Sequence, residues 1–573
     1  MGRILTSSRE YTLGMPLIEC VPNFSEGRDA SIINAISEAI ESVEGVRLLN
    51  VDPGKATNRT VYTFVGEPGP VCEAAFQAAK RGAQLIDMRH HKGEHPRFGF
   101  LDVCPLIPLD GISMEETAEL AKQLGRRMAD ELGMTIFLYE EAATSEERRN
   151  LAFLRQGEYE GLEARLASGF KPDCGSGFNP LLGATAVGAR DFLVAFNVNL
   201  NTTSVRRANS VAFDVREKGR QKRIGDPIAG ELAKDANGEV LWEPGKLKAV
   251  KAIGWFIEEY GMAQVSMNLT NISITPVHVA FDEVCNSAQG RGMRVTGSEL
   301  VGLIPLAAML DAGRYFLRKQ ERSTGVSDAE LIKIAIRSMG LDELAPFDPN
   351  ERIIEYAMRD KRKRRLVDLT LTAFTEETAS ESPAPGGGSI SAAMGAMGAA
   401  LACMVANLSS HKRGWDDRWE EFSNAAEAAK ACYARLLQLI DDDTDAFNRV
   451  MDAFGLPKGT PEEKAARSAA IQEATKGAVV VPLTVMEVAV EAMNSCLAMA
   501  KAGNPNSVSD AGVGALACRS AVLGAEMNVL INLGSLKDED FVSNAKSRAS
   551  ALRDRAEALE SEVLEVVRAA SAS

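Results

Sequence analysis

The sequence predicts an α+β/α multidomain fold: two α/β sandwich-like subdomains with mixed sheets in a ferredoxin-like alternation, followed by an all-α helical bundle. Three observations support this prediction. The chain has 573 residues, too many for one hydrophobic core. Short apolar runs alternate with amphipathic stretches as far as residue 357. From residue 366 onward, almost every window has the 3.6-residue period of a helix.

The first subdomain is predicted over residues 15–192, after a disordered tail at residues 1–14. The tail is polar and lacks an apolar core of signal-peptide length, which makes Met15 the candidate start of the fold. Further on, apolar runs typical of strands alternate with amphipathic helical stretches. Strands are expected at 17–22, 47–52, 60–66, 103–108 and 135–139, and helices at 30–42, 71–83 and 114–132.

The second subdomain, predicted over residues 193–357, resembles a smaller copy of the first. Residues 219–243 are rich in Gly, Lys, Arg and Asp, so we expect a flexible inserted loop there. A basic run then marks a change in composition, and residues 358–366 are predicted to be a linker rather than a nucleic-acid site. The alternating elements are expected at 192–200, 248–258, 263–275 and 295–301, with a helix at 278–289.

Residues 367–573 are predicted to form the helical domain. Residues 390–408 carry no charge and are long enough to cross a membrane, but they are mostly Ala and Gly. Because no second such stretch is expected, a packed buried helix is favoured over a membrane span. Helices are expected at 389–408, 417–454, 461–502, 510–533 and 538–570, some of them broken at Pro482 and at glycines.

Composition limits the partners and the compartment. A net charge of −15 disfavours nucleic acid or an anionic membrane surface as the main partner. The nine cysteines are scattered between Cys20 and Cys518 without a CxxC pair, so neither a disulfide framework nor a zinc site is indicated. We therefore expect a cytoplasmic protein without a metal.

Three of the five histidines, His90, His91 and His95, fall within six positions. Gly93 and Pro96 prevent this run from forming a simple helix or a central strand, so we expect a loop. Imidazole transfers protons near neutral pH, and charged residues surround these three rings. A proton-transfer loop is favoured over a purely structural one. A metal site ranks last, because an HxxxH pair requires an uninterrupted helix.

Two features of the helical domain suggest a binding site. Gly386, Gly387 and Gly388 precede a helix, where the backbone can approach a ligand and free amides can bind an anion. The alternative is a flexible linker capped by Ser389. A second polar loop, with Asn504, Asn506 and Asp510, precedes another small-residue helix, although such residues often only cap a helix. The pairing of the two loops favours a functional role.

A third feature is an acidic cluster on a long helix. An apolar stripe at three- and four-residue steps places Asp443 on the buried face, while Asp442 and Asp445 point elsewhere. Burial would raise the pKa of this carboxyl group and suit it to proton transfer. A buried aspartate satisfied by a neighbouring helix, or an acidic surface turn, remain the alternatives. The stripe consists of Leu436, Ile440, Phe447 and Val450.

Long, ordered motifs resemble the bifunctional formimidoyltransferase-cyclodeaminase family. In the first half they lie at residues 18–27, 57–62, 91–97 and 101–105. In the helical part they lie at 384–389, 456–464 and 528–533. The resemblance implies two steps of histidine degradation: transfer of the formimino group of N-formimino-L-glutamate to N5 of tetrahydrofolate, then cyclisation to 5,10-methenyltetrahydrofolate with release of ammonia.

The resemblance also implies roles for single residues. His95 would be the proton carrier of the transfer step, with Asp52 orienting the site and Glu94 and Arg97 as supporting residues. Asp443 would be the acid of the cyclisation step. The implied cosubstrate is tetrahydrofolate in its polyglutamylated form, without a metal, and the implied assembly is a homo-oligomer formed through the helical domain.

Two further stretches resemble the folate-binding segments of the family. In the second, Lys246 and Lys248 would supply positive charge to the glutamate tail of the folate. The first stretch differs slightly in length from the family pattern, and the 219–243 insertion is longer, which leaves details of the pocket open. The residues are Gly175, Ser176, Gly177, Phe178, Asn179, Pro180, Leu181, Leu182 and Gly183 in the first stretch, and Gly245, Lys246, Lys248 and Gly254 in the second.

Two other functions remain open on the sequence. One is an oligomeric folate-binding scaffold without activity, which the presence of His95 and Asp443 argues against. The other is a helical domain acting as a methenyltetrahydrofolate cyclohydrolase, which the resemblance suggests shares this fold. Release of ammonia would separate the cyclodeaminase from the cyclohydrolase.

Overall fold

The computed structural model describes residues 16–55, 57–93, 97–175, 177–225, 230–358 and 365–572. The chain divides into two compact units. The first, called the α/β unit, comprises Met1–Met309 and Ile336–Arg359; the second, called the helical unit, comprises Leu310–Ala335 and Asp360–Ser573. Mixed sheets in the N-terminal part and a helical C-terminal part are confirmed, whereas the domain limits drawn from the sequence stay predictions.

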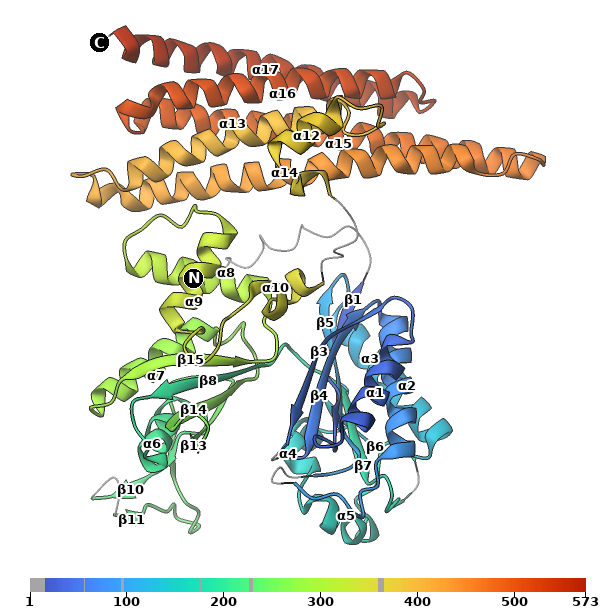
Figure 1. Cartoon of the computed structure of the whole chain (residues 1–573), viewed down its shortest axis with the longest axis vertical. Coiled ribbons are helices and arrows are strands. Elements are labelled where there is room, and N and C mark those ends of the chain that lie inside the picture. Colours follow the sequence, from blue (N-terminus) through green and yellow to red (C-terminus); the bar gives the residue numbers. More distant parts are fainter. Residues whose placement is uncertain are drawn as a thin grey trace. The chain divides into compact units, whose positions relative to one another are not determined.

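A seven-stranded mixed sheet forms the first half of the α/β unit (Figure 1). Its strand order is β1-β4-β2-β5-β7-β6, with β3 paired to β4; β7 lies parallel to β5 and β6, and the other pairs are antiparallel. The strands are β1 (Leu17–Cys20), β2 (Asn23–Phe24), β3 (Val46–Gly54), β4 (Arg59–Gly66), β5 (Leu101–Asp110), β6 (Thr135–Glu140) and β7 (Ala184–Ala189).

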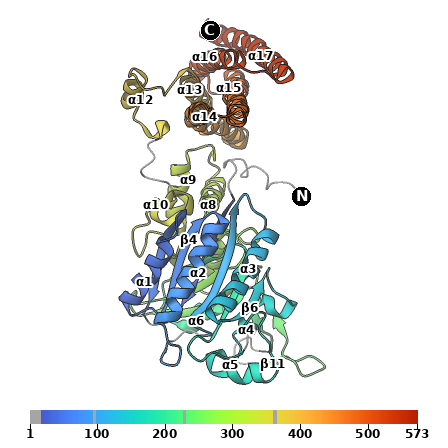
Figure 2. The ribbon, with the colours of Figure 1, turned by 90° about the vertical axis from the view of Figure 1, so that its right-hand side faces the viewer.

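Three long helices cover this sheet and bury its core (Figures 1 and 2). The third begins with a capping box, in which Ser113 and Glu116 bond each other's backbone amides, and ends at Gly133 in the left-handed conformation. The long helices are α1 (Ala30–Glu41), α2 (Pro68–Leu85) and α3 (Met114–Leu132), and the shorter elements are η1 (Glu146–Arg149), α4 (Leu151–Leu154) and α5 (Glu158–Ala167).

Strand β7 was not predicted from the sequence. Four of its six residues, ATAVGA, are Ala or Gly, which have little β-propensity, yet all six are buried. Because β7 lies between two parallel partners, the strand is defined by ladder hydrogen bonds and burial rather than by its own side chains.

The second half of the α/β unit has an antiparallel sheet of order β13-β14-β8-β15. In β13, Val250 and Ala252 are buried while Lys251, Ile253 and Trp255 are exposed, so only one face is covered by helices. The strands are β8 (Val194–Leu200), β13 (Val250–Ile257), β14 (Met262–Leu269) and β15 (Val295–Val301). The helices are α6 (Val205–Val215) and α7 (Val277–Gly290), followed along the chain by α8 (Leu306–Lys319), α9 (Asp328–Met339), α10 (Pro349–Arg352) and α11 (Ile354–Ala357).

The 219–243 insertion, which we expected to be a flexible loop, contains short strands. Its described residues form two short antiparallel pairs. The pair β9–β12 closes the base of the insertion, because β9 lies at its start and β12 at its end. The pairs are β9 (Arg220–Gln221) with β12 (Trp242–Glu243), and β10 (Arg223–Ile224) with β11 (Glu231–Leu232).

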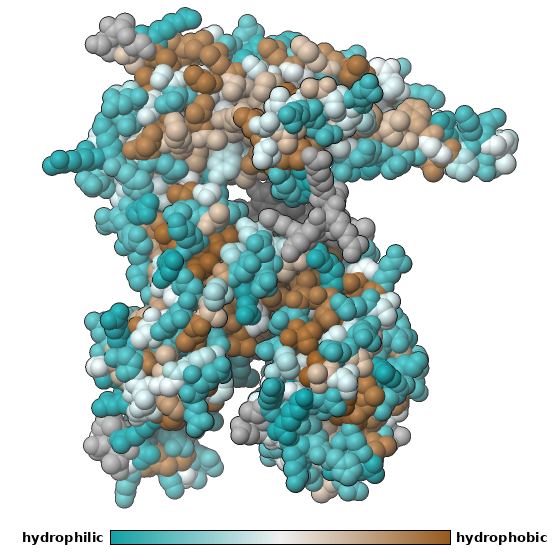
Figure 3. All heavy atoms as spheres, in the orientation of Figure 1, coloured by the Kyte–Doolittle hydropathy of each residue, from teal (hydrophilic) through white to brown (hydrophobic). Residues whose placement is uncertain are grey.

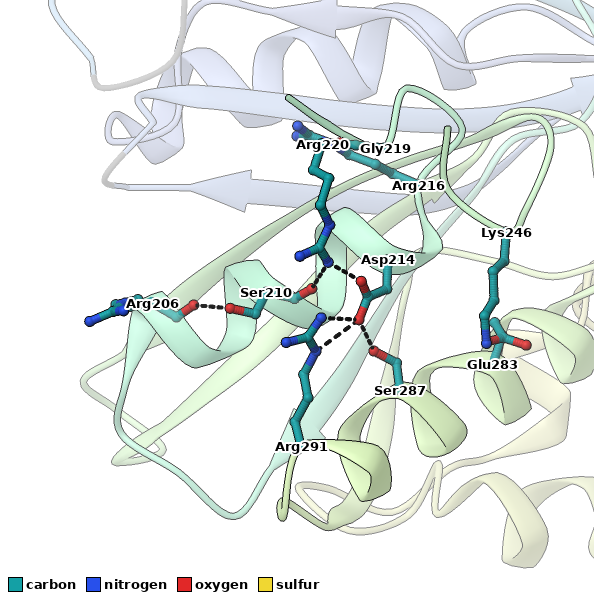
Figure 4. A network of polar contacts seen from close by, with 10 residues as sticks. All are labelled: Arg206, Ser210, Asp214, Arg216, Gly219, Arg220, Lys246, Glu283, Ser287 and Arg291. Carbon is teal, nitrogen blue, oxygen red and sulfur yellow. Dashed lines mark hydrogen bonds and ion pairs between the residues drawn. The ribbon is translucent and has the colours of Figure 1, made fainter. Parts of the chain in front are cut away.

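Asp214 of α6 holds the base of the 219–243 insertion in place through its polar contacts (Figure 4). Its carboxylate pairs with Arg220 of β9, and accepts hydrogen bonds from Ser287 at 2.7 Å and from Arg291 Nε at 2.8 Å. The backbone amide of Lys246, where the chain leaves the insertion, donates to the Asp214 carbonyl oxygen at 2.9 Å. One residue of α6 therefore holds the start and the end of the insertion.

The described residues of the helical unit include five long helices, α13 to α17 (Figures 1 and 2). The predicted helical domain is confirmed, but the predicted break at Pro482 is wrong, since α15 continues through this residue. Pro482 is buried, and packing on neighbouring helices offsets the one lost backbone bond. The helices are α12 (Leu371–Thr378), α13 (Gly387–Ser410), α14 (Trp419–Gly455), α15 (Pro461–Ala502), α16 (Val508–Leu533) and α17 (Glu539–Ala572), with short η2 (Leu366–Asp368), η3 (Asp416–Arg418) and η4 (Pro505–Ser507).

Three helices are long and apolar enough to cross a membrane by length and composition alone: Gly387–Ser410, Pro461–Ala502 and Pro505–Leu533. The expectation that no second such stretch exists is therefore wrong. In the helical unit, these helices pack against one another through small side chains. The core helices of a bundle and membrane-spanning helices have similar sequences here, because Ala and Gly allow neighbouring helices to approach closely in both.

Replacing Asp214 by alanine removes the partner of two arginines and a serine. Because the ion pairs are partly exposed, we expect a loss of only about 1–3 kcal/mol in unfolding free energy, with faster amide hydrogen exchange at β9 and β12. Asp235→Ala is the matched control, since Asp235 bonds only amides of its own turn, those of Asn237 and Glu239. Equal exchange at β9 in the two variants would contradict the anchoring role of Asp214.

Candidate active sites

The histidine run is a loop that lies on the turn between β3 and β4. Asn58, in the left-handed region with φ of 50°, accepts from the Gly27 amide at 3.0 Å and donates to the Lys92 carbonyl at 3.1 Å. Gly93 packs so closely that a Cβ atom there would lie 2.1 Å from the Thr57 carbonyl oxygen. The described residues 88–93 form turn and coil, as the sequence predicts.

His91 is buried and held by the backbone. Its Nε2 lies 2.8 Å from the Asn58 carbonyl oxygen, which can only accept, so Nε2 carries the hydrogen. Its Nδ1 is buried and has no hydrogen-bond partner among the residues that the structure describes. Burial lowers the pKa of His91, while the bond to Asn58 opposes this shift. The ring is therefore fixed in one orientation and favoured in its neutral form.

Glu94 and His95 lie outside the described residues, so their predicted roles stay predictions. Arg97, just after them, donates to the His91 carbonyl oxygen and pairs with Glu160 of α5. Its guanidinium lies 5.4 Å from the centre of the Tyr159 ring. The loop is thus anchored on both sides of His95, at Gly93 and at Arg97.

Asp52 lies near the end of β3, and its side chain is partly exposed to solvent. Burial raises its pKa; the charge of Arg352 lowers it, and that of Glu299 raises it further. Both residues belong to the second half of the α/β unit, so Asp52 lies within electrostatic reach of the second sheet. This position agrees with the predicted role of Asp52 in orienting the site, since a substrate bound between the two halves of the α/β unit would lie near its carboxyl group.

Two buried acidic groups of the first sheet were not singled out from the sequence, Asp102 next to Arg59 and Glu19 at the other end of β4. The fully buried carboxylate of Asp102 accepts from Arg59 Nη2 at 2.6 Å and pairs with Arg155. Glu19 of β1 is also buried, which raises its pKa to about 7 against an opposing effect of Arg190. Arg59 and Asp102 stand in the family-like motifs at 57–62 and 101–105, so a signal was present in the sequence.

The first folate-like stretch, 175–183, lies beside the histidine loop. The Met88 amide donates to the Leu181 carbonyl oxygen at 3.0 Å, and the Tyr159 hydroxyl donates to the Pro180 carbonyl oxygen at 2.6 Å. Asn179 accepts from the Leu181 amide at 3.0 Å and so shapes its own turn. The structure therefore joins this stretch to the loop, except for Ser176, which lies outside the described residues.

The second folate-like stretch packs on α6 instead. Asn209 bonds both the amide and the carbonyl of Gly254, at 3.0 and 3.1 Å. Lys246 pairs with Glu283 (Figure 4), and Lys248 lies 3.6 Å from Glu217. Each lysine thus stands beside an acidic residue, and the predicted contact of both lysines with the glutamate tail of the folate stays a prediction. Gly245 also serves packing, since a Cβ there would lie 2.0 Å from the Arg216 carbonyl oxygen.

A second candidate site lies in the helical unit, where α14 meets the N-terminus of α13. Asp443 of α14 accepts a hydrogen bond from Ser389 Oγ at 3.0 Å. A Cβ atom on Gly388 would lie 2.2 Å from Asp443 Oδ1, and one on Gly387 would lie 3.2 Å from Asn528 Nδ2. The glycines therefore bring the helix end directly against the carboxyl group and an amide of α16.

The environment of Asp443 favours its protonated form. Burial raises its pKa, and hydrogen bonds from the side chain and backbone of Ser389 oppose this shift. Leu436 and Ile440 of the predicted stripe are buried, but Phe447 is 41% exposed, so the stripe is not buried along its whole length. Asp443 lies where the buried part ends. Asp442 points elsewhere, as expected, and pairs with Arg435 at 3.2 Å.

The polar loop at Asn504, Asn506 and Asp510 does not join this site within one chain. The Asn504 amide donates to Ser409 Oγ at 2.8 Å, at the far end of α13. Ser409 is 21 residues beyond Gly388, roughly 30 Å along a helix. The two loops stand apart because α13 and α16 are antiparallel, with Gly514 beside Gly398 and Asn528 beside Gly387. Asn504 caps η4 by accepting from the Asn506 amide.

Among the residues that the structure describes, no group of three or more His, Cys, Asp or Glu side chains could hold a metal ion, and the nine cysteines are free thiols. Glu94 and His95 lie outside the described residues, so the expectation of sites without a metal stays a prediction. The hydrogen bonds and titratable groups of the two sites suit them to proton transfer.

The fold and the sites define a protein of two parts, an α/β part with a histidine loop and a helical part with a protonatable aspartate. Three family profiles match it: "Formiminotransferase domain, N-terminal subdomain" at residues 17–190, "Formiminotransferase domain" at 195–359 and "Formiminotransferase-cyclodeaminase" at 370–551. The formimidoyltransferase-cyclodeaminase of Rattus norvegicus is 44% identical over 543 residues, 94% of this chain and 96% of that protein. The chain belongs to the formimidoyltransferase-cyclodeaminase family.

Each part also has relatives that stand alone. The glutamate formimidoyltransferase of Thermoplasma acidophilum is 41% identical over 307 residues, 53% of this chain and 93% of that protein. The methenyltetrahydrofolate cyclohydrolase of Methylorubrum extorquens is 39% identical over 199 residues, 35% of this chain and 96% of that protein.

Gly93→Ala tests the close approach of the histidine loop to the β3–β4 turn. The added methyl group would overlap the Thr57 carbonyl, so we expect a loss of about 1–3 kcal/mol in unfolding free energy and faster hydrogen exchange at residues 57–59. Gly69→Ala, in the first turn of α2, is the control because nothing lies within 4 Å of its added Cβ. Equal stability of the two variants would contradict the packing described here.

Proposed function

We propose that this chain transfers the formimino group of N-formimino-L-glutamate to N5 of tetrahydrofolate, and then cyclises 5-formiminotetrahydrofolate to 5,10-methenyltetrahydrofolate with release of ammonia. The observation that carries the proposal is that transferase profiles match residues 17–190 and 195–359 and the cyclodeaminase profile matches residues 370–551, with one candidate proton-transfer group in each part. Two sites fit two consecutive reactions on one folate.

In the transfer step, N5 attacks the formimino carbon and forms a tetrahedral intermediate. Glutamate can leave only if its nitrogen gains a proton, which a positioned histidine can supply. We assign this role to His95, with Asp52 orienting the site and Glu94 and Arg97 supporting it. The anchoring of the loop at Gly93 and Arg97 supports this assignment, because it fixes the backbone on both sides of His95.

In the cyclisation step, N10 attacks the same carbon and ammonia must depart. An amine leaves more readily when it is protonated, so the step needs an acid. Asp443 fits this role because burial raises its pKa and it lies in reach of the free amides of α13. Gly386, Gly387 and Gly388 would let the folate approach this carboxyl group.

For the cosubstrate, we propose polyglutamylated tetrahydrofolate bound without a metal. The chemistry requires acids and a fixed geometry rather than a Lewis acid. The stretch 175–183 is the best supported folate-binding segment, because it lies beside the histidine loop. With Lys246 and Lys248 paired to glutamates, the tail would have to displace Glu283 or Glu217 to use their charge.

We further propose a cytoplasmic homo-oligomer that associates through its helical unit, without a nucleic acid or membrane partner. Large apolar side chains of α16 point outward: Met527 is 68% exposed and Ile531 76%. A patch of this kind is typical of a subunit interface. Light scattering on the purified protein tests this proposal, and a mass of 61.5 kDa, that of one chain, would contradict it.

The second candidate function is a cyclohydrolase in the helical part, and the relative from Methylorubrum extorquens is the observation that favours it. A cyclohydrolase adds water to the methenyl carbon, whereas a cyclodeaminase expels ammonia from formiminotetrahydrofolate. Ammonia formed in proportion to methenyltetrahydrofolate supports the proposed function. An inactive folate-binding scaffold would form neither product.

Single substitutions should separate the two activities. We expect His95→Ala to lower transfer at least about a hundredfold, the usual contribution of a general acid, and to leave cyclisation of supplied 5-formiminotetrahydrofolate intact. Asp443→Asn should do the reverse. His90→Ala and Asp452→Asn are matched controls at exposed neighbours in the same loop and helix. Loss of both activities in one folded variant would contradict the assignment to two sites.

Ser389→Ala should change the pH dependence of cyclisation. The Ser389 hydroxyl lowers the pKa of Asp443, so removing it raises that pKa. An acid catalyst is active while protonated, and its activity falls as the pH rises through its pKa. The fall in the kcat profile should therefore move to higher pH. Ser391→Ala is the control, since Ser391 donates to the Gly387 carbonyl at 2.7 Å and not to Asp443. An unmoved profile would contradict the acid role of Asp443.

A further inference from the structure

The turn between α8 and α9 packs into the helical unit, although it belongs by sequence to the formiminotransferase profile at 195–359. Ser323 and Thr324, at the tip of this turn, are each only 1% exposed. The groove that receives them lies between α13 and α14, which belong to the profile at 370–551. The boundary between the two compact units therefore differs from the boundary between the two family profiles.

Four hydrogen bonds with side chains of the groove hold Ser323 and Thr324, one of them between the hydroxyls of Thr324 and Ser423 at 2.9 Å. Ser323 Oγ donates to Asn407 Oδ1 at 2.6 Å. The Thr324 amide donates to Ser423 Oγ at 3.0 Å, and the Thr324 hydroxyl donates to Glu427 Oε1 at 2.6 Å. Both faces of the groove take part, because Asn407 comes from α13 and the other two partners come from α14. Buried polar groups satisfied in this way specify one arrangement.

Gly325 fits the groove because it has no side chain. A Cβ atom there would lie 2.3 Å from the Cβ of Ala426, far inside contact distance. Its carbonyl oxygen accepts from Asn407 Nδ2 at 3.0 Å and from Cys403 Sγ at 3.2 Å. At the start of α9, Asp328 pairs with Lys430 at 2.7 Å. Shape and hydrogen bonds therefore match one short segment, Ser-Thr-Gly, and an ion pair follows it at Asp328.

The turn lies at the surface of the helical unit rather than inside a continuous core. An open hollow of about 510 Å³ borders it, lined by Val326 and Ser327 of the turn, by Leu408 of α13 and by His411 just after this helix. A segment docked from a separately built part would lie at the surface in this way. The stand-alone relatives agree with such an origin, since each corresponds to one part of this chain.

We propose that the Ser323–Gly325 turn and its groove form a non-covalent joint that holds the transferase and cyclodeaminase parts of the chain together. The joint acts in addition to the peptide connection at residues 358–366. The groove on α13 and α14 is thus a docking site, and its occupant is the α8–α9 turn of the same chain. The joint takes part in neither reaction: Glu427 precedes Asp443 by 16 residues on α14, roughly 24 Å along the helix.

Cutting the connection in the full-length protein tests the joint. A protease recognition sequence replaces residues 359–364, the purified protein is cleaved, and the two fragments are followed by gel filtration with light scattering at falling concentration. We expect the fragments to stay together with the native joint. Gly325→Leu should release them, and Thr324→Val, which keeps the shape but removes the hydroxyl, should weaken their association about tenfold.

Gly290→Leu is the matched control, because nothing lies within 4 Å of a Cβ added there. Both activities, measured before cleavage, should be unchanged in Thr324→Val, which shows that this variant is folded. Separation of the fragments with the native joint would overturn the proposal. Fragments of Gly325→Leu and Thr324→Val that remain as tightly associated as those of the control would also overturn it, since another contact would then hold the parts.

Discussion

Both sites depend on backbone segments that approach more closely than any side chain permits. In the α/β unit, Gly93 places the histidine loop against the carbonyl oxygen of Thr57, and Asn58 ties the same loop to the segment at Gly27. In the helical unit, Gly388 lets the start of α13 contact the carboxyl group of Asp443. These contacts fix where the titratable groups lie. A single added methyl group would therefore move those groups as well as disturb the packing.

The two sites solve the same chemical problem with different groups. Each reaction must protonate a departing nitrogen, which near neutral pH requires an acid whose pKa has been adjusted. In the proposed function, the α/β unit would do this with an imidazole, whose pKa needs little adjustment. The helical unit would do it with the carboxyl group of Asp443, whose pKa is raised by burial and lowered by Ser389. Separate units therefore allow each group its own environment while one folate serves both reactions.

The sequence predicted the features that depend on local pattern. The sheets, the helical domain, the loop around His91 and the inward-facing Asp443 follow from periodicity, from glycine and proline, and from residue chemistry. Roles of single residues came from the family resemblance. Features set by distant packing could not be predicted: β7 is a strand because of its neighbours, and Pro482 lies in an unbroken helix. The antiparallel arrangement of α13 and α16 separates Asn504 from Gly388, although their loops look alike in the sequence.

The most direct measurement mixes the purified full-length protein with tetrahydrofolate and N-formimino-L-glutamate, and follows methenyltetrahydrofolate by absorbance and ammonia by a coupled assay. The two-site account predicts that both products form in equal amounts. Folded protein that binds folate but forms neither product would contradict it, as would methenyltetrahydrofolate formed without ammonia.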